Sequence, residues 1–136
     1  MNTDRIEDNI RTFFATRASG LVCAYLFGSV ARGESRPGSD VDLATLYQQE
    51  PPATLEGLGF DLAGDLERQL GREVDMVCLN RASVDLIHRI LRDGIIVLDR
   101  DPSARIRFEV KARNEYLDFR PILDRYRRVS SKSGHG

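Results

Sequence analysis

The sequence lacks any apolar run close to the roughly 20 residues that a membrane-spanning helix needs, so we expect no membrane span. Its polar start, MNTDRIEDNI, predicts no secretory signal peptide. Cysteine is scarce: only Cys23 and Cys78 occur, and both lie within apolar, strand-like runs. We therefore expect buried free thiols in a reducing cytoplasm, rather than a disulfide or a thiolate metal site.

Histidine is equally scarce, and no Cys, His or acidic residues surround His88 at the spacing of metal ligands. We interpret His88 as an exposed helix residue. The chain also lacks an internal repeat and any sign of a second domain. Its 136 residues fit one globular domain with a real hydrophobic core over residues 1–129, followed by a polar, disordered tail over 130–136.

Charge is distributed unevenly along the chain. Residues 1–99 carry 10 basic and 16 acidic side chains, a balance of −6, whereas residues 100–136 carry 10 basic and 5 acidic side chains, a balance of +5. The basic C-terminal segment is interleaved with aromatic residues. It is either a solvated helix that covers the sheet or a docking face for an acidic partner or nucleic acid.

Hydrophobic periodicity predicts alternating helices and strands. Helices are expected at 3–18, 55–70, 83–92 and from Pro102 or Ser103 to about Tyr126, with Pro121 kinking or splitting the last one. Strands are expected at 22–27, 41–46, 72–79 and 95–98. This order predicts an α/β (α+β) fold, with a mixed sheet of three to four strands flanked by helices.

The stretch from Tyr25 to Leu46 organises the chain. An apolar strand ends at Gly28 and Ser29, where glycine permits a sharp turn and the serine hydroxyl can cap a following helix. Such a turn directs free backbone N–H groups to one spot, which suits a phosphate. Arg32 follows closely and is the better candidate for a phosphate contact; for Arg36 we favour a solvent-exposed role.

Two carboxylates follow this turn. Asp40 and Asp42 are two residues apart, so a strand over 41–46 projects them from one face, where they form a ready site for a hard cation such as Mg²⁺. Asp75 interrupts the strand at 72–79 where an apolar residue would pack better. It is either a third carboxylate of the site or a residue on an edge strand. Together with the turn at Gly28 and Ser29, these carboxylates predict a phosphoryl or nucleotidyl transfer site. The alternative is purely structural: an ordinary turn, Asp40 as a cap between loop and strand, and Asp42 as a solvated residue on an exposed face of the sheet.

The segments Gly28-Ser29-Val30-Ala31-Arg32-Gly33-Glu34 and Ser39-Asp40-Val41-Asp42-Leu43 resemble the signature of the DNA-polymerase-beta-like nucleotidyltransferase superfamily. The strand Glu73-Val74-Asp75-Met76-Val77 resembles its third acidic strand. The small size and the segment Arg113–Pro121 resemble the minimal nucleotidyltransferase (MNT) group.

This resemblance implies a Mg²⁺-dependent nucleotidyltransferase that uses ATP. Asp40, Asp42 and Asp75 would be catalytic and would bind the metal, with Asp75 as ligand or general base. Gly28, Ser29 and Arg32 would bind the nucleotide. The reaction would transfer AMP to a hydroxyl and release pyrophosphate.

The resemblance also suggests the acceptor. MNT proteins are typically encoded with an HEPN-domain RNase toxin and neutralise it by transferring AMP to one of its tyrosines. We therefore expect a cytoplasmic antitoxin in a hetero-oligomeric complex with an HEPN toxin, without direct nucleic-acid binding. Two alternatives remain: an antitoxin that acts by binding alone, and a small-molecule nucleotidyltransferase resembling the aminoglycoside-modifying enzymes.

Overall fold

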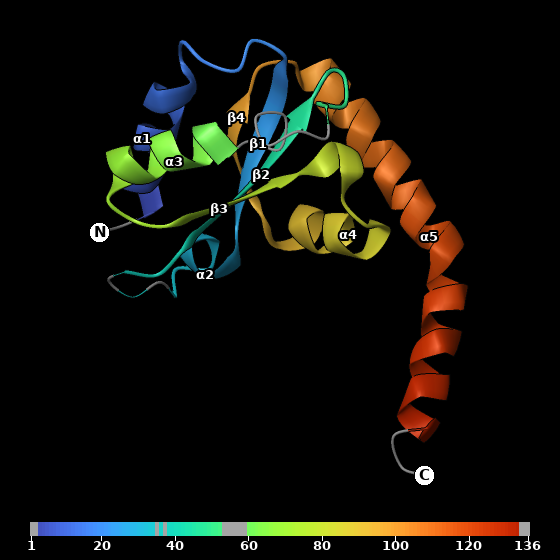
Figure 1. Ribbon diagram of the computed structural model, residues 1–136. Helices are drawn as coiled ribbons and strands as arrows, with labels where there is room; N and C mark the ends of the chain where they lie inside the picture. Colours follow the sequence, from blue (N-terminus) through green and yellow to red (C-terminus); the bar gives the residue numbers. More distant parts are fainter. Residues whose placement is uncertain (1–2, 35, 37, 53–59, 134–136) are drawn as a thin grey trace.

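The apolar runs of the sequence form four strands of one sheet in the computed structural model, which describes residues 3–34, 36, 38–52 and 60–133 (Figure 1). The strands are β1 (Leu21–Phe27), β2 (Val41–Tyr47), β3 (Val74–Cys78) and β4 (Ile95–Asp99), in the order β3-β2-β1-β4. β1 is antiparallel to β2 and β4, whereas β2 and β3 are parallel. The predicted mixed sheet flanked by helices is confirmed.

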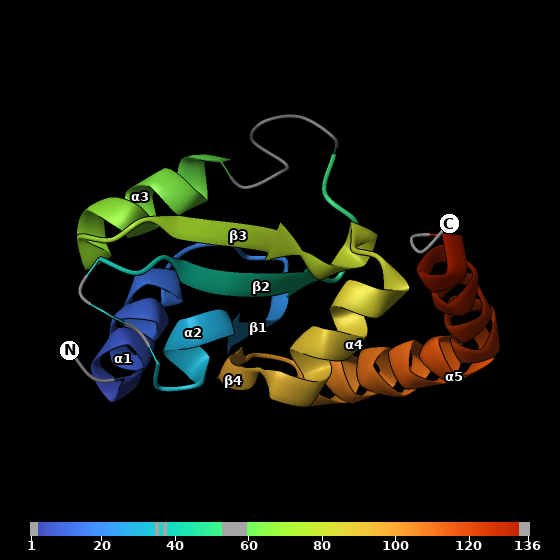
Figure 2. The ribbon, with the colours of Figure 1, turned by 90° about the horizontal axis from the view of Figure 1, so that it is seen from below.

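Helices cover both faces of this sheet (Figures 1 and 2). They are α1 (Thr3–Phe14), α2 (Gly28–Ala31), α3 (Phe60–Leu70), a short 3-10 turn η1 (Leu79–Arg81), α4 (Val84–Asp93) and α5 (Pro102–Ser133). One core layer joins α1 and α3 to the sheet, and the second joins α4 and α5 to its other face. The order of elements follows the predicted one: α2 is the helix expected after the turn at Gly28 and Ser29, and η1 is a short addition.

The two core layers follow from the alternation of side chains along the strands. In β2, Val41 and Leu43 pack in the layer of α1 and α3, while Ala44 and Leu46 pack in the layer of α4 and α5. The predicted apolar stripe of α1 is buried against the first layer: Ile6, Ile10, Phe13 and Phe14. Both faces of the sheet are therefore occupied by helices, and polar groups can reach solvent only near the strand ends.

Two helix boundaries differ from those expected, and a third lies outside the described residues. α1 ends at Phe14 rather than at residue 18, because turns take over and Ala18 adopts a φ of +56°. The predicted start of the helix at 55–70 falls largely on residues 53–59, which lie outside the described residues. α5 extends to Ser133 rather than ending at Tyr126, so the expected polar tail from residue 130 begins within the helix.

Pro121 lies inside α5. Figure 2 shows that the axis of α5 changes direction between its orange N-terminal half and its red C-terminal part. Proline removes one backbone N–H and its ring clashes with the preceding turn, so it bends a helix without ending it where the flanking residues are good helix formers. The kink predicted from the sequence is the form that α5 takes.

Two predictions about single side chains have different outcomes. Cys23 and Cys78 are both free, as expected, and burial raises the pKa of the Cys23 thiol to about 12. The interpretation of His88 as an exposed residue is wrong. Its ring is half-buried and stacks on Tyr116 of α5, with 3.5 Å between ring centroids and planes 2° apart. In the part of the chain that the structure describes, no helix has the length and apolar character needed to cross a membrane.

Candidate functional site

The turn after β1 is built around Gly28. Its φ of +74° lies in the left-handed region, which glycine adopts without steric cost. α2 begins at this residue, with Phe27 as its N-cap and no side-chain capping hydrogen bond. The prediction that the Ser29 hydroxyl caps the helix is therefore wrong. Ser29 is half-buried, and its carbonyl oxygen accepts the backbone N–H of Glu34 at 2.9 Å, which closes the turn.

The same glycine packs directly against an acidic side chain. A Cβ atom added to Gly28 would overlap Asp42 Oδ2 and lie 3.0 Å from its Cγ. Phe27, the residue before, is the register partner of Asp42 across the β1–β2 pair. The absence of a side chain at position 28 is therefore what lets the Asp42 carboxylate lie against the turn. The predicted turn and the predicted carboxylate of Asp42 are therefore in contact.

Asp75 lies beside Asp42. The two residues are register partners in the parallel pair of β2 and β3, so their side chains project from the same face of the sheet. β3 is an edge strand and Asp75 is exposed, as the alternative interpretation of this residue also required. Its pairing with Asp42 distinguishes it from an ordinary edge carboxylate. Asp40 precedes β2 by one residue and is also exposed.

Electrostatics join these three residues. Burial raises the pKa of the half-buried Asp42 carboxyl above its ordinary value, and the negative charges of Asp75 and Asp40 raise it further. A raised carboxyl pKa signals a local excess of negative charge. Such an environment favours either a proton or a cation.

The described residues do not form a preorganised metal site. Among residues 3–34, 36, 38–52 and 60–133, no three His, Cys, Asp or Glu side chains converge closely enough to hold a metal ion together. Asp40 and Asp75 are exposed, so their side chains have room to turn apart as like charges favour. The donor set nevertheless suits Mg²⁺, which prefers carboxylate oxygens. The crowding of charge around Asp42 is the observation that supports the fit.

Arg32 is a basic residue whose charge reaches Asp42. Its charge lowers the pKa of the Asp42 carboxyl, against the effect of the neighbouring acids. About half of its side chain is exposed, and its Nε donates to Glu34 at 3.0 Å. This weak surface ion pair leaves guanidinium donors for an incoming phosphate. Arg36, by contrast, contributes its backbone to the loop, and its side chain is exposed.

Arg72 is the residue of this region that sequence reasoning missed. Its Nε donates to the carbonyl oxygen of Ser39 at 2.9 Å, and a terminal nitrogen donates to that of Arg36 at 3.3 Å. The N–H of Val41 donates to the carbonyl oxygen of Glu73 at 2.8 Å. These bonds fasten the loop on either side of Asp40 to the start of β3. No sequence signal marks such a bond, because its acceptors are backbone atoms.

A search against protein-family models finds one match, to the family described as polymerase beta nucleotidyltransferase, over residues 8–103. The matched range contains the turn at Gly28, all three carboxylates and the strands that carry them. It ends at the second residue of α5. No curated protein gives a significant match to the sequence.

Several solved structures share the fold. A toxin–antitoxin structure with AMP-PNP superposes with a TM-score of 0.71 at 25% identity, covering 88% of this chain and 97% of the other. A Shewanella oneidensis complex of a tri-AMPylated HEPN toxin with its MNT antitoxin gives 0.68 at 23% identity, covering 91% and 98%.

A third structure, provisionally assigned as a minimal nucleotidyltransferase, gives a TM-score of 0.58 at 32% identity. The match covers 70% of this chain and 95% of the other. The family model covers more than half of the chain, and the provisionally assigned protein is matched over nearly its whole length. The chain belongs to the polymerase beta nucleotidyltransferase family, and its structural relatives include antitoxins of HEPN/MNT toxin–antitoxin pairs.

Proposed function

We propose that this protein is an antitoxin that transfers AMP from ATP to a tyrosine of a cognate HEPN-type toxin. The observation that carries the proposal is the packing of Asp42 against Gly28, with Asp75 as its neighbour on the next strand. This arrangement sets a turn suited to phosphate beside paired carboxylates, which is the equipment of nucleotidyl transfer.

In this proposal, Asp40, Asp42 and Asp75 hold Mg²⁺. The ion, when bound, supplies positive charge to the triphosphate and to the transition state. The raised pKa of the Asp42 carboxyl fits this role, because a cation offsets the charge that crowds the site. Gly28 and Ser29 receive the phosphates, and the Arg32 guanidinium binds a phosphate oxygen.

The reaction follows from these positions. The tyrosine oxygen attacks the α-phosphorus of ATP, and the bond from that phosphorus to the oxygen that bridges to the β-phosphate breaks. Pyrophosphate leaves with that oxygen. The exposed Asp75 carboxylate orients the hydroxyl and accepts its proton. Catalysis by such a site consists mainly of positioning and electrostatics.

The choice of acceptor rests on similarity rather than on the geometry of the site. The toxin–antitoxin structure with AMP-PNP shares the fold over nearly the whole of its own length. The Shewanella complex holds an AMPylated HEPN toxin, and this defines the reaction to test. A bulky anionic group on an RNase would repel the phosphates of its RNA substrate, which explains how the transfer could neutralise a toxin.

The test is to incubate the protein with ATP labelled at the α-phosphate, Mg²⁺ and the protein encoded by the adjacent reading frame, which this proposal expects to be of the HEPN type. We expect the label on a tyrosine of that protein. Asp42→Asn should lower the rate by about three orders of magnitude, because it removes several kcal/mol of transition-state stabilisation. Asp61→Asn, an exposed carboxylate on α3, is the matched control and should transfer AMP at the wild-type rate.

Two results would overturn the proposal in different ways. Neutralisation of the toxin by Asp42→Asn, with no labelling by the wild type, would show an antitoxin that acts by binding alone. Labelling of a small hydroxylated compound such as an aminoglycoside, and not of the protein, would show a small-molecule nucleotidyltransferase.

A further inference from the structure

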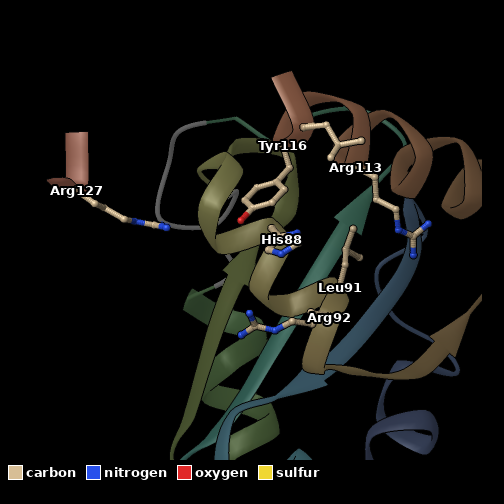
Figure 3. A pocket seen from close by; sticks show the side chains of 7 residues that line it. His88, Leu91, Arg92, Arg113, Tyr116 and Arg127 are labelled. Carbon is tan, nitrogen blue, oxygen red and sulfur yellow. The ribbon is translucent and has the colours of Figure 1, made fainter. Parts of the chain in front are cut away.

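A groove lies between α4 and the part of α5 that extends beyond it (Figure 3). It is a cavity of about 680 Å³. Its apolar wall consists of Leu91 of α4 and Leu117 of α5, together with the stacked rings of His88 and Tyr116. Leu117 is 60% exposed and is one of several large apolar side chains of α5 that solvent reaches.

The polar lining of the groove is entirely basic. Arg92 comes from α4, and Arg113 and Arg127 come from α5; no carboxylate lines the cavity among the described residues. Each arginine also faces one acid of its own chain outside the lining: Arg92 pairs with Asp93 at 2.9 Å, Arg113 with Glu109 at 3.6 Å and Arg127 with Asp85 at 3.2 Å. The guanidinium groups of Arg92 and Arg113 have five donors each, which these contacts do not exhaust. The lining therefore combines three guanidinium groups with apolar side chains.

One end of the groove lies close to the candidate active site. Asp93 ends α4 and forms an ion pair with Arg92, which lowers the pKa of the Asp93 carboxyl; Arg32 and His88 contribute to the same shift. Ile95, two residues after Asp93, pairs with Leu26 of β1, and the next residue of β1, Phe27, pairs with Asp42. The end of α4 that carries Arg92 therefore lies beside the turn and the acidic end of the sheet.

The family match ends at residue 103, so nearly all of α5, which forms one wall of the groove, lies beyond the matched range. α5 carries nine basic and four acidic residues, and several large apolar side chains on it are exposed. A long, basic and partly apolar helix at a domain edge is suited to hold a partner.

We propose that the groove between α4 and α5 is the docking site for the acceptor protein, and that it receives an acidic segment carrying apolar side chains. This inference rests on the proposed function for the identity of that protein. The basic lining complements carboxylates of the segment, and the leucine and aromatic wall receives its apolar side chains. Docking there brings the acceptor to the side of the molecule on which Asp42 and Asp75 lie.

The lining favours a protein segment over RNA. The rings of His88 and Tyr116 lie 3.5 Å apart, so no base can insert between them, and each ring offers only its outer face. The carboxylates that face the three arginines keep the positive potential local. An RNA backbone requires a continuous track of cations, whereas a protein segment needs only a few carboxylates at fixed positions.

The experiment measures the affinity of the full chain for the protein encoded by the adjacent reading frame, by calorimetry without ATP and Mg²⁺. The groove variant is Arg113→Gln with Arg127→Gln. The matched control is Arg107→Gln with Arg125→Gln, which removes the same charge from the same helix outside the groove lining. Glutamine preserves helix propensity and most of the side-chain stem.

We expect the groove variant to weaken binding at least about tenfold, because two charge-assisted contacts are lost, and the control to change it less than about twofold. Leu117→Gln, a substitution on an exposed position that should not affect folding, tests the apolar wall and should weaken binding about threefold. Asp42→Asn should bind the partner as tightly as the wild type.

Equal binding by the groove and control variants would overturn the docking proposal. Loss of binding to a twelve-nucleotide single-stranded RNA in the groove variant alone, with partner binding intact, would identify a nucleic-acid site instead. A wild-type dimer that dissociates in the groove variant would identify a self-interface. Tight, groove-dependent binding without AMP transfer would uphold the docking site while the proposed function fails.

Discussion

The acidic end of the sheet and the basic groove between α4 and α5 lie on the same side of the molecule but are built in different ways. At the acidic end, backbone pairing sets the geometry: Asp42 and Asp75 are register partners, and Gly28 contacts Asp42 because it has no side chain. In the groove, the lining side chains come from two helices, α4 and α5, and the guanidinium groups lie apart from one another around the cavity (Figure 3).

This difference separates two tasks. Chemistry on a triphosphate demands carboxylates held within a fraction of an ångström, and a sheet provides that rigidity. Recognition of a partner tolerates adjustment of long arginine side chains, which a bent helix at the edge of the domain can supply. The acidic end also concentrates like charges, whereas each groove arginine has an acid nearby. The first region is therefore the more sensitive to small displacements.

Gly28→Ala should break the acidic end most severely. The new Cβ would overlap the Asp42 carboxylate, and alanine at a φ of +74° is strained by about 1–2 kcal/mol. Displacing the carboxylate by about 1 Å should lower the AMP-transfer rate about 100-fold. Single-turnover labelling with saturating partner measures this effect.

The control for that substitution is Gly20→Ala. Gly20 has open space around it and no positive φ, so alanine there should leave both the rate and the melting temperature near those of the wild type. A Gly28→Ala protein with wild-type activity would mean that Asp42 does not act from its position against the turn.

The acidic end could be predicted from sequence largely because its geometry is local. A glycine after an apolar run, and aspartates two residues apart on a strand, fix their own directions with little help from tertiary structure. Asp75 required more, because its pairing with Asp42 depends on which strands are neighbours. The resemblance to a known signature supplied that adjacency, and the parallel register agrees with it.

The groove could not be predicted in this way. Its lining residues span α4 and more than three turns of α5, and their convergence depends on how the two helices pack and on the bend that includes Pro121. From the sequence, His88 was an unremarkable polar residue, because nothing local indicates that Tyr116 stacks on it. The role of Arg72 could not be predicted for a similar reason, because its partners are carbonyl oxygens more than 30 positions away. Side-chain contacts over such separations carry no periodic signal.

Arg72→Gln tests whether the acidic end depends on a rigid backbone, because it should make the loop before Asp40 more mobile while leaving every carboxylate in place. Its bonds to the carbonyl oxygens of Ser39 and Arg36 hold the loop that precedes Asp40. We expect about a tenfold loss in AMP transfer, with the apparent affinity for Mg²⁺, measured by calorimetry with Mg²⁺ alone, reduced by a similar factor. Partner binding at the groove should not change.

The matched control for Arg72 is Arg68→Gln. Arg68 is exposed on α3 and forms an ion pair with Asp65, away from the loop, so its loss should leave Mg²⁺ affinity unaltered. If Arg72→Gln lowered the melting temperature alone, with Mg²⁺ affinity intact, its role would be general stability rather than positioning of Asp40.

The smallest expected effect concerns the stability cost of the crowded acids. The folded chain raises the pKa of the Asp42 carboxyl above its ordinary value of 3.8, so the folded state binds this proton more tightly than the unfolded state. The stabilisation from this group is fully present below pH 3.8 and is lost as the pH rises through the folded pKa. Ionised Asp42 therefore destabilises the protein at neutral pH, and Asp42→Asn should raise the melting temperature by about 2–4 °C at pH 7.

Thermal unfolding should show this gain shrinking as the pH falls toward 4, while Asp61→Asn, away from the crowded acids, should show no such trend. A melting temperature lowered by Asp42→Asn at pH 7 would mean that the carboxylate is stabilised in its ionised form. The negative charges of the acidic end would then not lower the stability of the folded protein. In that respect the acidic end would no longer differ from the groove, whose arginines are paired with acids.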